Sequence, residues 1–353
     1  MDFEPTLASV SLGNPEVHPI TKRLSAAASH GFKCVEIVEA DIINEAKTLG
    51  HDDSAQGQIK GAESIRKICD DLGLKVVVLQ PFWFYEGLLD RAEHAVRIRK
   101  LELWLKMAAV LGTRLIQIPT NWLGEGTTGD VGIITQDLIE MAEMGLKQAQ
   151  PISFAYEGVA WGTHIDTWQG TWEMVKRVNR PNFGLCLDTY HIAARVWGDP
   201  TAMSGMNEDG DRALDESLDE MIRELDVKKI FYVQPSDAER LYEPLVEGHP
   251  FYDQMQRPRM SWSRNARLFC YEEEYGGYLP VEKILETIVV KMGYLGLISA
   301  ESFSRHLFNP RPHIPDEYAR RAIKSWKRMI EVLKQKASET VRNDLQNRQS
   351  NTE

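Results

Sequence analysis

The sequence is poor in cysteine, lacks long apolar runs and carries fewer positive than negative charges. Its 353 residues include four cysteines, none of them in a CxxC pair, so neither a disulfide framework nor a cysteine zinc site is expected. No apolar run approaches the roughly 20 residues that cross a bilayer, so we expect no membrane partner. Lysine and arginine total 41 against 52 acidic residues, a formal charge of −11, which argues against a nucleic-acid partner.

Two further absences bear on location and domain organisation. The opening string MDFEPTLASV has no basic stretch followed by an apolar one, so we see no secretory signal and expect a cytoplasmic protein. No proline- or serine-rich linker and no fixed-period repeat divides the chain. We therefore predict a single catalytic domain over residues 1–336, followed by a polar, disordered tail over 337–353.

The sequence does contain a regular alternation of short apolar runs and longer amphipathic stretches. The runs are often rich in Val and Ile and are mostly too short for buried helices, which favours strands. There are eight of them, namely TLASVSL from Thr6, CVEIVE from Cys34, KVVVLQ from Lys75, RLIQIP from Arg114, ISFAYE from Ile152, FGLCLD from Phe183, KIFYVQ from Lys229 and LGLISAE from Leu295. Helix-like stretches such as 18–31, 61–73 and 90–112 lie between them, and each ends in Gly, a common helix stop.

Eight strand-and-helix pairs are the count of a (β/α)₈ TIM barrel, and we predict that fold. A doubly wound sheet is the alternative, but it favours a glycine-rich phosphate turn after its first strand, and SLGNPEVHP has one glycine. Two connections, about Thr189 to Leu214 and Pro235 to Leu279, are too long for simple turns. Both follow strands, so we expect long loops over the active-site face.

Polar residues end four consecutive predicted strands. They are Glu157, Asp188, Gln234 and Glu301. Because barrel strands converge at their carboxyl ends, these side chains would meet, and unpaired carboxylates would repel one another. A divalent cation removes the repulsion, and oxygen-only ligands suit Mg²⁺, Mn²⁺ or Co²⁺ better than Zn²⁺. The alternative is that each residue caps a helix or pairs with an arginine, and Glu36 inside the second run is either a supporting residue or part of a salt bridge.

Candidates for proton transfer and substrate binding lie close to these positions. His191 follows Asp188 in the string LDTYH and is our predicted general base, with a capping role as the alternative. In SWSRNARLF, Arg264 and Arg267 alternate with aromatic residues, and an arginine fork suits a substrate carboxylate. Ser263 would add a hydroxyl donor. The alternative is that these arginines pair with the acidic run 272–274.

Several longer strings resemble the fungal 3-dehydroshikimate dehydratases of quinate catabolism, which belong to the xylose isomerase-like, or sugar phosphate isomerase/epimerase, superfamily of TIM barrels. The strings include DTYHIAARVWGDPT, QPSDAERL, PRMSWSRNARLF, EYGGYLPV and ISAESFSR, and the resemblance extends to about Trp326. It implies conversion of 3-dehydroshikimate to protocatechuate and water. It also implies metal ligands at Glu157, Asp188, Gln234 and Glu301, a catalytic His191, and substrate contacts from Ser263, Arg267 and Arg91.

The resemblance has one notable departure and leaves rival functions open. The family carries a polar residue, often His, within the string that reads PFWFYEG here, where Trp83 and Phe84 instead suggest an aromatic wall. A sugar or inositol-type isomerase, epimerase or dehydratase is one rival, and it needs no carboxylate clamp. A catalytically silent ligand-sensing barrel is the other. We expect a small carboxylic-acid substrate and leave the oligomeric state open, with a homo-oligomer as one expectation.

Overall fold

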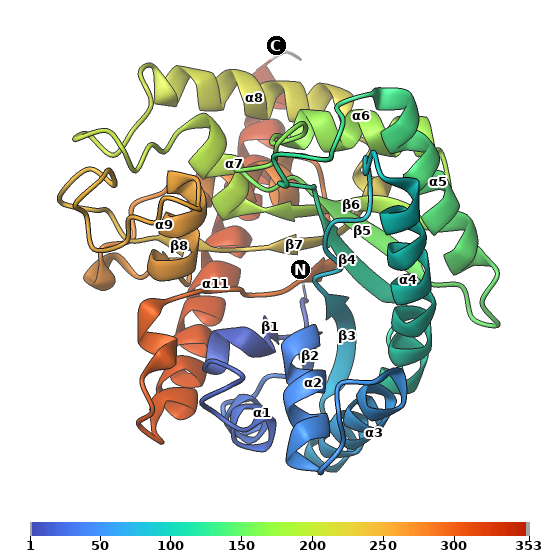
Figure 1. The fold of residues 1–353 in the computed structure, drawn as a ribbon. Helices are drawn as coiled ribbons and strands as arrows, with labels where there is room; N and C mark the ends of the chain where they lie inside the picture. Colours follow the sequence, from blue (N-terminus) through green and yellow to red (C-terminus); the bar gives the residue numbers. More distant parts are fainter. Residues whose placement is uncertain (1, 351–353) are drawn as a thin grey trace.

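The computed structural model describes residues 2–350, with side chains for 2–340 and 342, and its centre is a barrel of parallel strands ringed by helices (Figure 1). All neighbouring strands run parallel, in the order β1-β2-β3-β4-β5-β6-β7-β10. Their bounds are β1 (Thr6–Ala8), β2 (Cys34–Val38), β3 (Lys75–Gln80), β4 (Leu115–Pro119), β5 (Ser153–Glu157), β6 (Phe183–Asp188), β7 (Ile230–Gln234) and β10 (Leu297–Ile298). Each lies within one of the eight predicted runs, which are thereby confirmed.

The first and last strands close the ring through a short bridge. Leu7 pairs with Ala300 in parallel register. The backbone N–H of Ala8 donates to Ala300 O at 2.9 Å, and the N–H of Ala300 donates to Thr6 O at 2.9 Å. This closure confirms the predicted TIM barrel, because an open doubly wound sheet has no contact between its edges.

The helices surround the strands, and three of them overlap the predicted stretches 18–31, 61–73 and 90–112 with ends that differ by one to six residues. They are α1 (Ile20–Ser29), α2 (Glu39–Thr48), α3 (Ala55–Leu72), α4 (Arg91–Leu111), α5 (Val131–Leu146), α6 (Trp168–Val178), α7 (Thr189–Val196), α8 (Gly210–Glu224), α9 (Pro258–Ala266), α10 (Val281–Leu285) and α11 (Ile314–Ser350). Asp90 caps α4 by accepting from the N–H of Ala92 at 2.8 Å. Gly73 and Gly112 end α3 and α4 with φ of 68° and 79°, left-handed values that glycine adopts without a Cβ penalty.

A small apolar layer inside the barrel supports the polar strand ends. Val78, Ala155, Cys186 and Tyr232 form a buried cluster separate from the main core. Each lies two residues before a polar residue that ends its strand, so the alternation along a strand puts both on the same inward face. The polar ends therefore lie on a closed apolar floor.

The two long connections contain secondary structure of their own. The first includes all of α7 and the start of α8. The second folds back as β8 (Asp237–Ala238) and β9 (Arg267–Leu268), which pair antiparallel, with α9 between them (Figure 1). The buried Asp237 carboxylate accepts from the backbone N–H groups of Ala238 (2.7 Å), Tyr278 (3.2 Å) and Leu279 (2.9 Å). This side chain therefore ties the two ends of the second connection together at its base.

The chain end differs from the sequence expectation. We expected residues 337–353 to be disordered, but α11 continues as helix through Ser350. The physical reason is that an existing helix is extended at low cost for each added residue, and Ala337, Glu339 and Arg342 are good helix formers at the start of this stretch. Residues 351–353 of the predicted tail lie outside the described residues.

Candidate active site

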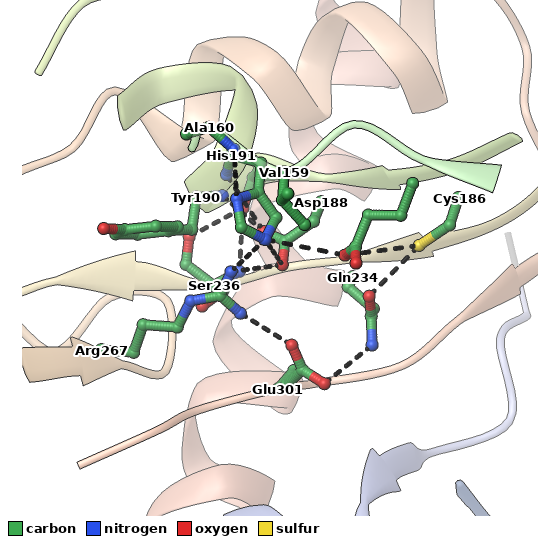
Figure 2. Close-up of polar contacts among 12 residues, drawn as sticks. Val159, Ala160, Cys186, Asp188, Tyr190, His191, Gln234, Ser236, Arg267 and Glu301 are labelled. Atoms are coloured by element: carbon green, nitrogen blue, oxygen red, sulfur yellow. Dashed lines mark hydrogen bonds and ion pairs between the residues drawn. The ribbon is translucent and has the colours of Figure 1, made fainter. Parts of the chain in front are cut away.

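Four polar side chains lie at the carboxyl ends of four neighbouring strands, as the sequence predicted. They are Glu157 on β5, Asp188 on β6, Gln234 on β7 and Glu301 just after β10. Each is at most 4% exposed. Figure 2 shows Asp188, Gln234 and Glu301 directed toward a common region of the barrel. Glu157, Asp188 and His191 each offer a ligand atom within 4.8 Å of the other two.

One arginine lies directly among these acids. Arg267, on β9, donates from Nη1 to Glu301 Oε2 and from Nη2 to Asp188 Oδ2, both at 2.7 Å (Figure 2). Its guanidinium lies 4.3 Å from the centre of the Tyr190 ring. Burial alone would lower the pKa of Arg267, but the facing carboxylates outweigh burial and raise it. Arg267 is therefore a permanent positive charge inside an acidic cluster.

Two carboxamides join Glu301 to a fourth acid, Glu36 on β2. Gln80 Nε2 donates to Glu301 Oε1 at 2.9 Å and to Glu36 Oε2 at 3.1 Å. Gln234 Nε2 donates to the same Glu301 oxygen at 3.0 Å and lies 3.3 Å from both Glu36 oxygens. With its nitrogen facing two carboxylates, Gln234 turns Oε1 the other way, where Cys186 Sγ lies at 3.1 Å. Glu36 thus supports the site through carboxamides, and it forms no salt bridge with the residues described.

Gln117 on β4 donates in the same way to the acid at the end of β5. Its Nε2 donates a short hydrogen bond to Glu157 Oε2. Neither Gln80 nor Gln117 was singled out from the sequence. Gln80 ends its predicted strand, so the strand-end rule that found the acids would also have found Gln80. Gln117 lies two residues before the end of β4, where the strand register pairs it with Ala155, and its side chain reaches diagonally to Glu157.

His191 lies in the first turn of α7, next to the acids. Asp188 Oδ1 accepts from the N–H of Tyr190 at 2.7 Å and so fixes the start of this helix. The N–H of Ala160 donates to His191 Nδ1 at 3.1 Å, while Nε2 lies 3.0 Å from Arg267 Nη2 and 3.8 Å from a Glu157 oxygen. Burial, with the Arg267 charge, holds the pKa of His191 well below its usual range. The ring is therefore neutral at physiological pH.

The charge balance of the cluster fits a divalent cation. Burial raises the pKa of Glu157, Asp188 and Glu301, and it raises the pKa of Glu36 to about 8. These raised values reflect the cost of ionising all four acids, because a single guanidinium would then leave an excess of negative charge in a low-dielectric site. A dication would supply the missing positive charge, and carboxylate and carboxamide oxygens are donors that hard cations accept. This donor set supports a divalent metal ion.

A cavity of about 400 Å³ opens above the cluster and is lined by Gln80, Gln117, Glu157, His191, Arg267 and Glu301 among others. One side of it is aromatic. Trp83 and Trp122 line the cavity, with ring centres 5.6 Å apart, and Phe84 packs edge-on against Trp122 at 4.6 Å. Trp161 also lines the cavity and lies 4.8 Å from the His191 ring. The expected aromatic wall is present, and Trp122 and Trp161, which the sequence did not single out, extend it.

Glu86 fastens the two loops that carry this wall. Its Oε1 accepts from the N–H of Asn121 at 2.7 Å and from the hydroxyl of Tyr156 at 2.9 Å. Asn121 Nδ2 in turn donates to Glu86 O at 2.9 Å. Burial raises the pKa of Glu86 to about 7, despite these hydrogen bonds. The β3–α4 and β4–α5 loops are therefore joined by a buried carboxyl group.

Of the predicted substrate-binding residues, some line the cavity and one does not. Ser263 is buried on α9 and lines the cavity, as do Arg264 and Arg267. Arg91 lies at the start of α4, donates to Asp137 Oδ1 at 2.7 Å, and is absent from the cavity lining. The structure therefore brings Arg267 to the acidic cluster and Ser263 to the cavity above it, and it leaves Arg91 outside both.

Comparison with known families agrees with this geometry. The family model described as "Xylose isomerase-like TIM barrel" matches residues 24–335. This chain belongs to that family. A fusion protein of a xylose isomerase-like TIM barrel and 4-hydroxyphenylpyruvate dioxygenase superposes with a TM-score of 0.68 at 26% identity, over 92% of this chain and 42% of that one. A structure of the IOLI protein with a bound zinc atom superposes at 0.66 and 17% identity, over 94% and 99% of the two chains.

Curated relatives show which members of the family this chain resembles. The 3-dehydroshikimate dehydratase of Neurospora crassa is 41% identical over 93% of this chain and 94% of its own length. The 3-dehydroshikimate dehydratase of Pseudomonas aeruginosa is 29% identical over 85% of this chain, which matches 38% of that longer protein. These matches confirm the family resemblance found in the sequence strings. Among the described residues, no helix is both long enough and apolar enough to cross a bilayer.

Proposed function

We propose that this protein is a metal-dependent 3-dehydroshikimate dehydratase, a hydro-lyase that forms protocatechuate and water. The observation that carries the proposal is the 41% identity to the Neurospora crassa enzyme of that name over nearly the full length of both chains. The strand-end acids, the neutral histidine and the cationic loop beside one cavity supply groups that the reaction requires.

Glu157, Asp188, Gln234 and Glu301 would hold the metal, for which we favour Mg²⁺, Mn²⁺ or Co²⁺ because all four donors are oxygen atoms. When bound, such an ion acts as a Lewis acid that stabilises negative charge developing on the substrate's ketone oxygen. Glu36, Gln80 and Gln117 hold the ligand side chains in orientation. Arg267 keeps two ligands in place through its terminal nitrogens.

His191 is suited to move the protons of an elimination. The reaction removes the proton on the carbon next to the ketone, expels the β-hydroxyl as water, and is completed by tautomerisation to the aromatic ring. Because the neutral ring has one proton, it can accept from only one of its two N–H neighbours, Ala160 and Arg267. When Nε2 is the acceptor it can take the substrate proton, and the resulting imidazolium can donate that proton to the leaving hydroxyl.

The test is to incubate purified protein with 3-dehydroshikimate and Mn²⁺ or Mg²⁺ and follow the ultraviolet absorbance of the aromatic product. We expect protocatechuate to accumulate. A matched incubation with neutral ketoses and inosose would reveal a sugar or inositol enzyme. Turnover of those substrates without turnover of the acid would contradict the proposal, as would ligand binding with no turnover of any of them.

A further inference from the structure

Two arginines three residues apart reach the same cavity in very different surroundings. Arg267 is 1% exposed, and both of its terminal nitrogens donate to acids of the cluster, Glu301 and Asp188. Arg264 lies on the surface of α9, lines the cavity, and its guanidinium has no hydrogen bond or ion pair with any residue in the described part of the chain. Arg264 is therefore a cation at the cavity without a bound anion.

The shape of the substrate separates these two positions. In 3-dehydroshikimate the carboxylate is attached to the side of the ring away from the ketone and its neighbouring hydroxyl. If those two oxygens lie at the acidic cluster, the carboxylate points away from it, toward the cavity mouth. Repulsion from Glu157, Asp188 and Glu301 favours the same orientation.

We propose that Arg264, with Ser263 beside it, is the residue that binds the substrate carboxylate, while Arg267 serves the metal ligands. This inference rests on the proposed function, and it changes the expectation from the sequence, which favoured Arg267 for the carboxylate. Ser263 is 2% exposed and lines the cavity next to Arg264. A planar guanidinium can hold a carboxylate through two parallel hydrogen bonds.

The other arginines of this face are already engaged. Arg257 donates to Trp161 O and Gly162 O at 2.8 and 2.7 Å. Arg305 pairs with Glu239 at 2.7 Å. Both guanidinium groups therefore already bind groups of the protein.

The charge environment of Arg264 agrees with this assignment. Burial lowers the pKa of Arg264, and the charge of Asp253 partly opposes this shift. Asp253, however, accepts from the N–H of Met255 at 2.8 Å and from Gln256 Nε2 at 2.6 Å, so its carboxylate is used within its own loop. A partly desolvated guanidinium without a direct partner gains from an incoming anion.

The experiment compares R264A, R264K and R267A with R320A, which removes an exposed arginine of α11 outside the cavity lining. Each variant is assayed with 3-dehydroshikimate and with an analogue that carries a hydroxymethyl group in place of the carboxylate. For R264A we expect the KM of the acid to rise about 10- to 100-fold, as for a lost charge-assisted hydrogen bond. Its kcat and its Mn²⁺ affinity by titration calorimetry should stay within a few-fold of wild type.

The other three variants serve as comparisons for R264A. R264K should recover part of the loss, R320A should match wild type, and R267A should weaken Mn²⁺ binding and lower kcat for both substrates. The assignment is overturned if R264A leaves the KM of the acid unchanged or raises the KM of acid and analogue equally. If the wild-type protein does not convert 3-dehydroshikimate, the proposed function fails. Calorimetric binding of protocatechuate to wild type and R264A then still tests the carboxylate contact separately.

Discussion

The two halves of the barrel end their strands in different chemistry. From β5 onward the strands end in three acids and one carboxamide, all of them candidate metal ligands. On the other side, β3 and β4 bring the carboxamides Gln80 and Gln117, which donate N–H groups to those acids. An acid can ligate a cation strongly, whereas an amide nitrogen can only orient the acid. In the proposed enzyme, one half of the barrel would hold the metal and the other half would orient its ligands.

The cavity walls repeat this division. Trp83 and Trp122 rise from the loops after β3 and β4, so the first half contributes an apolar wall. The loop after β7 contributes Ser263 and Arg264 on the opposite half. A ring with one charged edge would meet aromatic faces on one side and a cation on the other, which fixes its orientation.

The strongest way to test this division is to remove a ligand acid. E157Q and E301Q should each weaken Mn²⁺ binding more than about 100-fold and abolish turnover. Each substitution removes the negative charge of a proposed metal ligand, and both metal binding and turnover depend on that charge. Calorimetry with Mn²⁺ and the protocatechuate assay measure the two losses. Chelation of wild type should abolish activity and Mn²⁺ should restore it. Full activity in protein shown to be metal-free would contradict the metal site.

A change at His191 should separate chemistry from metal binding. H191A should lower kcat by about 10²- to 10⁴-fold, the range for a lost general acid or base. Its Mn²⁺ affinity should remain near wild type, because the proposed ligands are intact. Single-turnover kinetics together with calorimetry check both statements. A variant that turns over at the wild-type rate would move the proton-transfer role to another residue.

A change in the first half of the barrel should have a smaller effect of a different kind. E36Q replaces one of the two oxygens that face the Gln234 nitrogen with an NH₂ group, so the Gln234 amide is free to rotate away from the proposed metal. We expect Mn²⁺ affinity to fall about 10- to 100-fold, as for other residues that orient metal ligands. With saturating Mn²⁺, kcat should largely recover, which it should not do in E301Q. Equal behaviour of E36Q and E301Q would show that Glu36 is itself a ligand.

The last prediction concerns the stability of the fold and not the chemistry, and it involves the buried Glu86 that joins the two loops of the aromatic wall. Because burial raises the pKa of Glu86 from 4.5 to about 7, the folded protein holds its proton more tightly than the unfolded chain. Glu86 therefore reduces stability progressively as the pH rises from 4.5 to 7, by about 3 kcal/mol at most. E86Q should lose this part of the pH dependence. Urea unfolding of both proteins at pH 5 and pH 8 measures it, and identical pH slopes would contradict the prediction.

Much of the fold and half of the site follow from local sequence pattern. The eight strands are visible as short apolar runs, and the acids are visible because a barrel gathers strand ends. The contact between Arg267 and its two acids is not visible, because it depends on the path of a 45-residue connection between Pro235 and Leu279. The Gln117 contact depends on strand register, which one sequence does not encode locally. Arg91 shows the opposite case, a residue suggested by family strings whose side chain lies with Asp137.

The tie at Asp237 gives that long connection a property of its own. Because one buried carboxylate gathers the backbone at both ends of the segment, everything between Ala238 and Tyr278 leaves the barrel and returns through a single neck. Within the segment, Arg267 returns to Asp188 and Glu301, so the part near this residue is coupled to the acids. Residues 240–256 lie farther out and are mostly exposed. Changes of length there need not disturb the strands, whereas a graft of the whole segment onto a related barrel would also carry over the arginine that holds two of the acids.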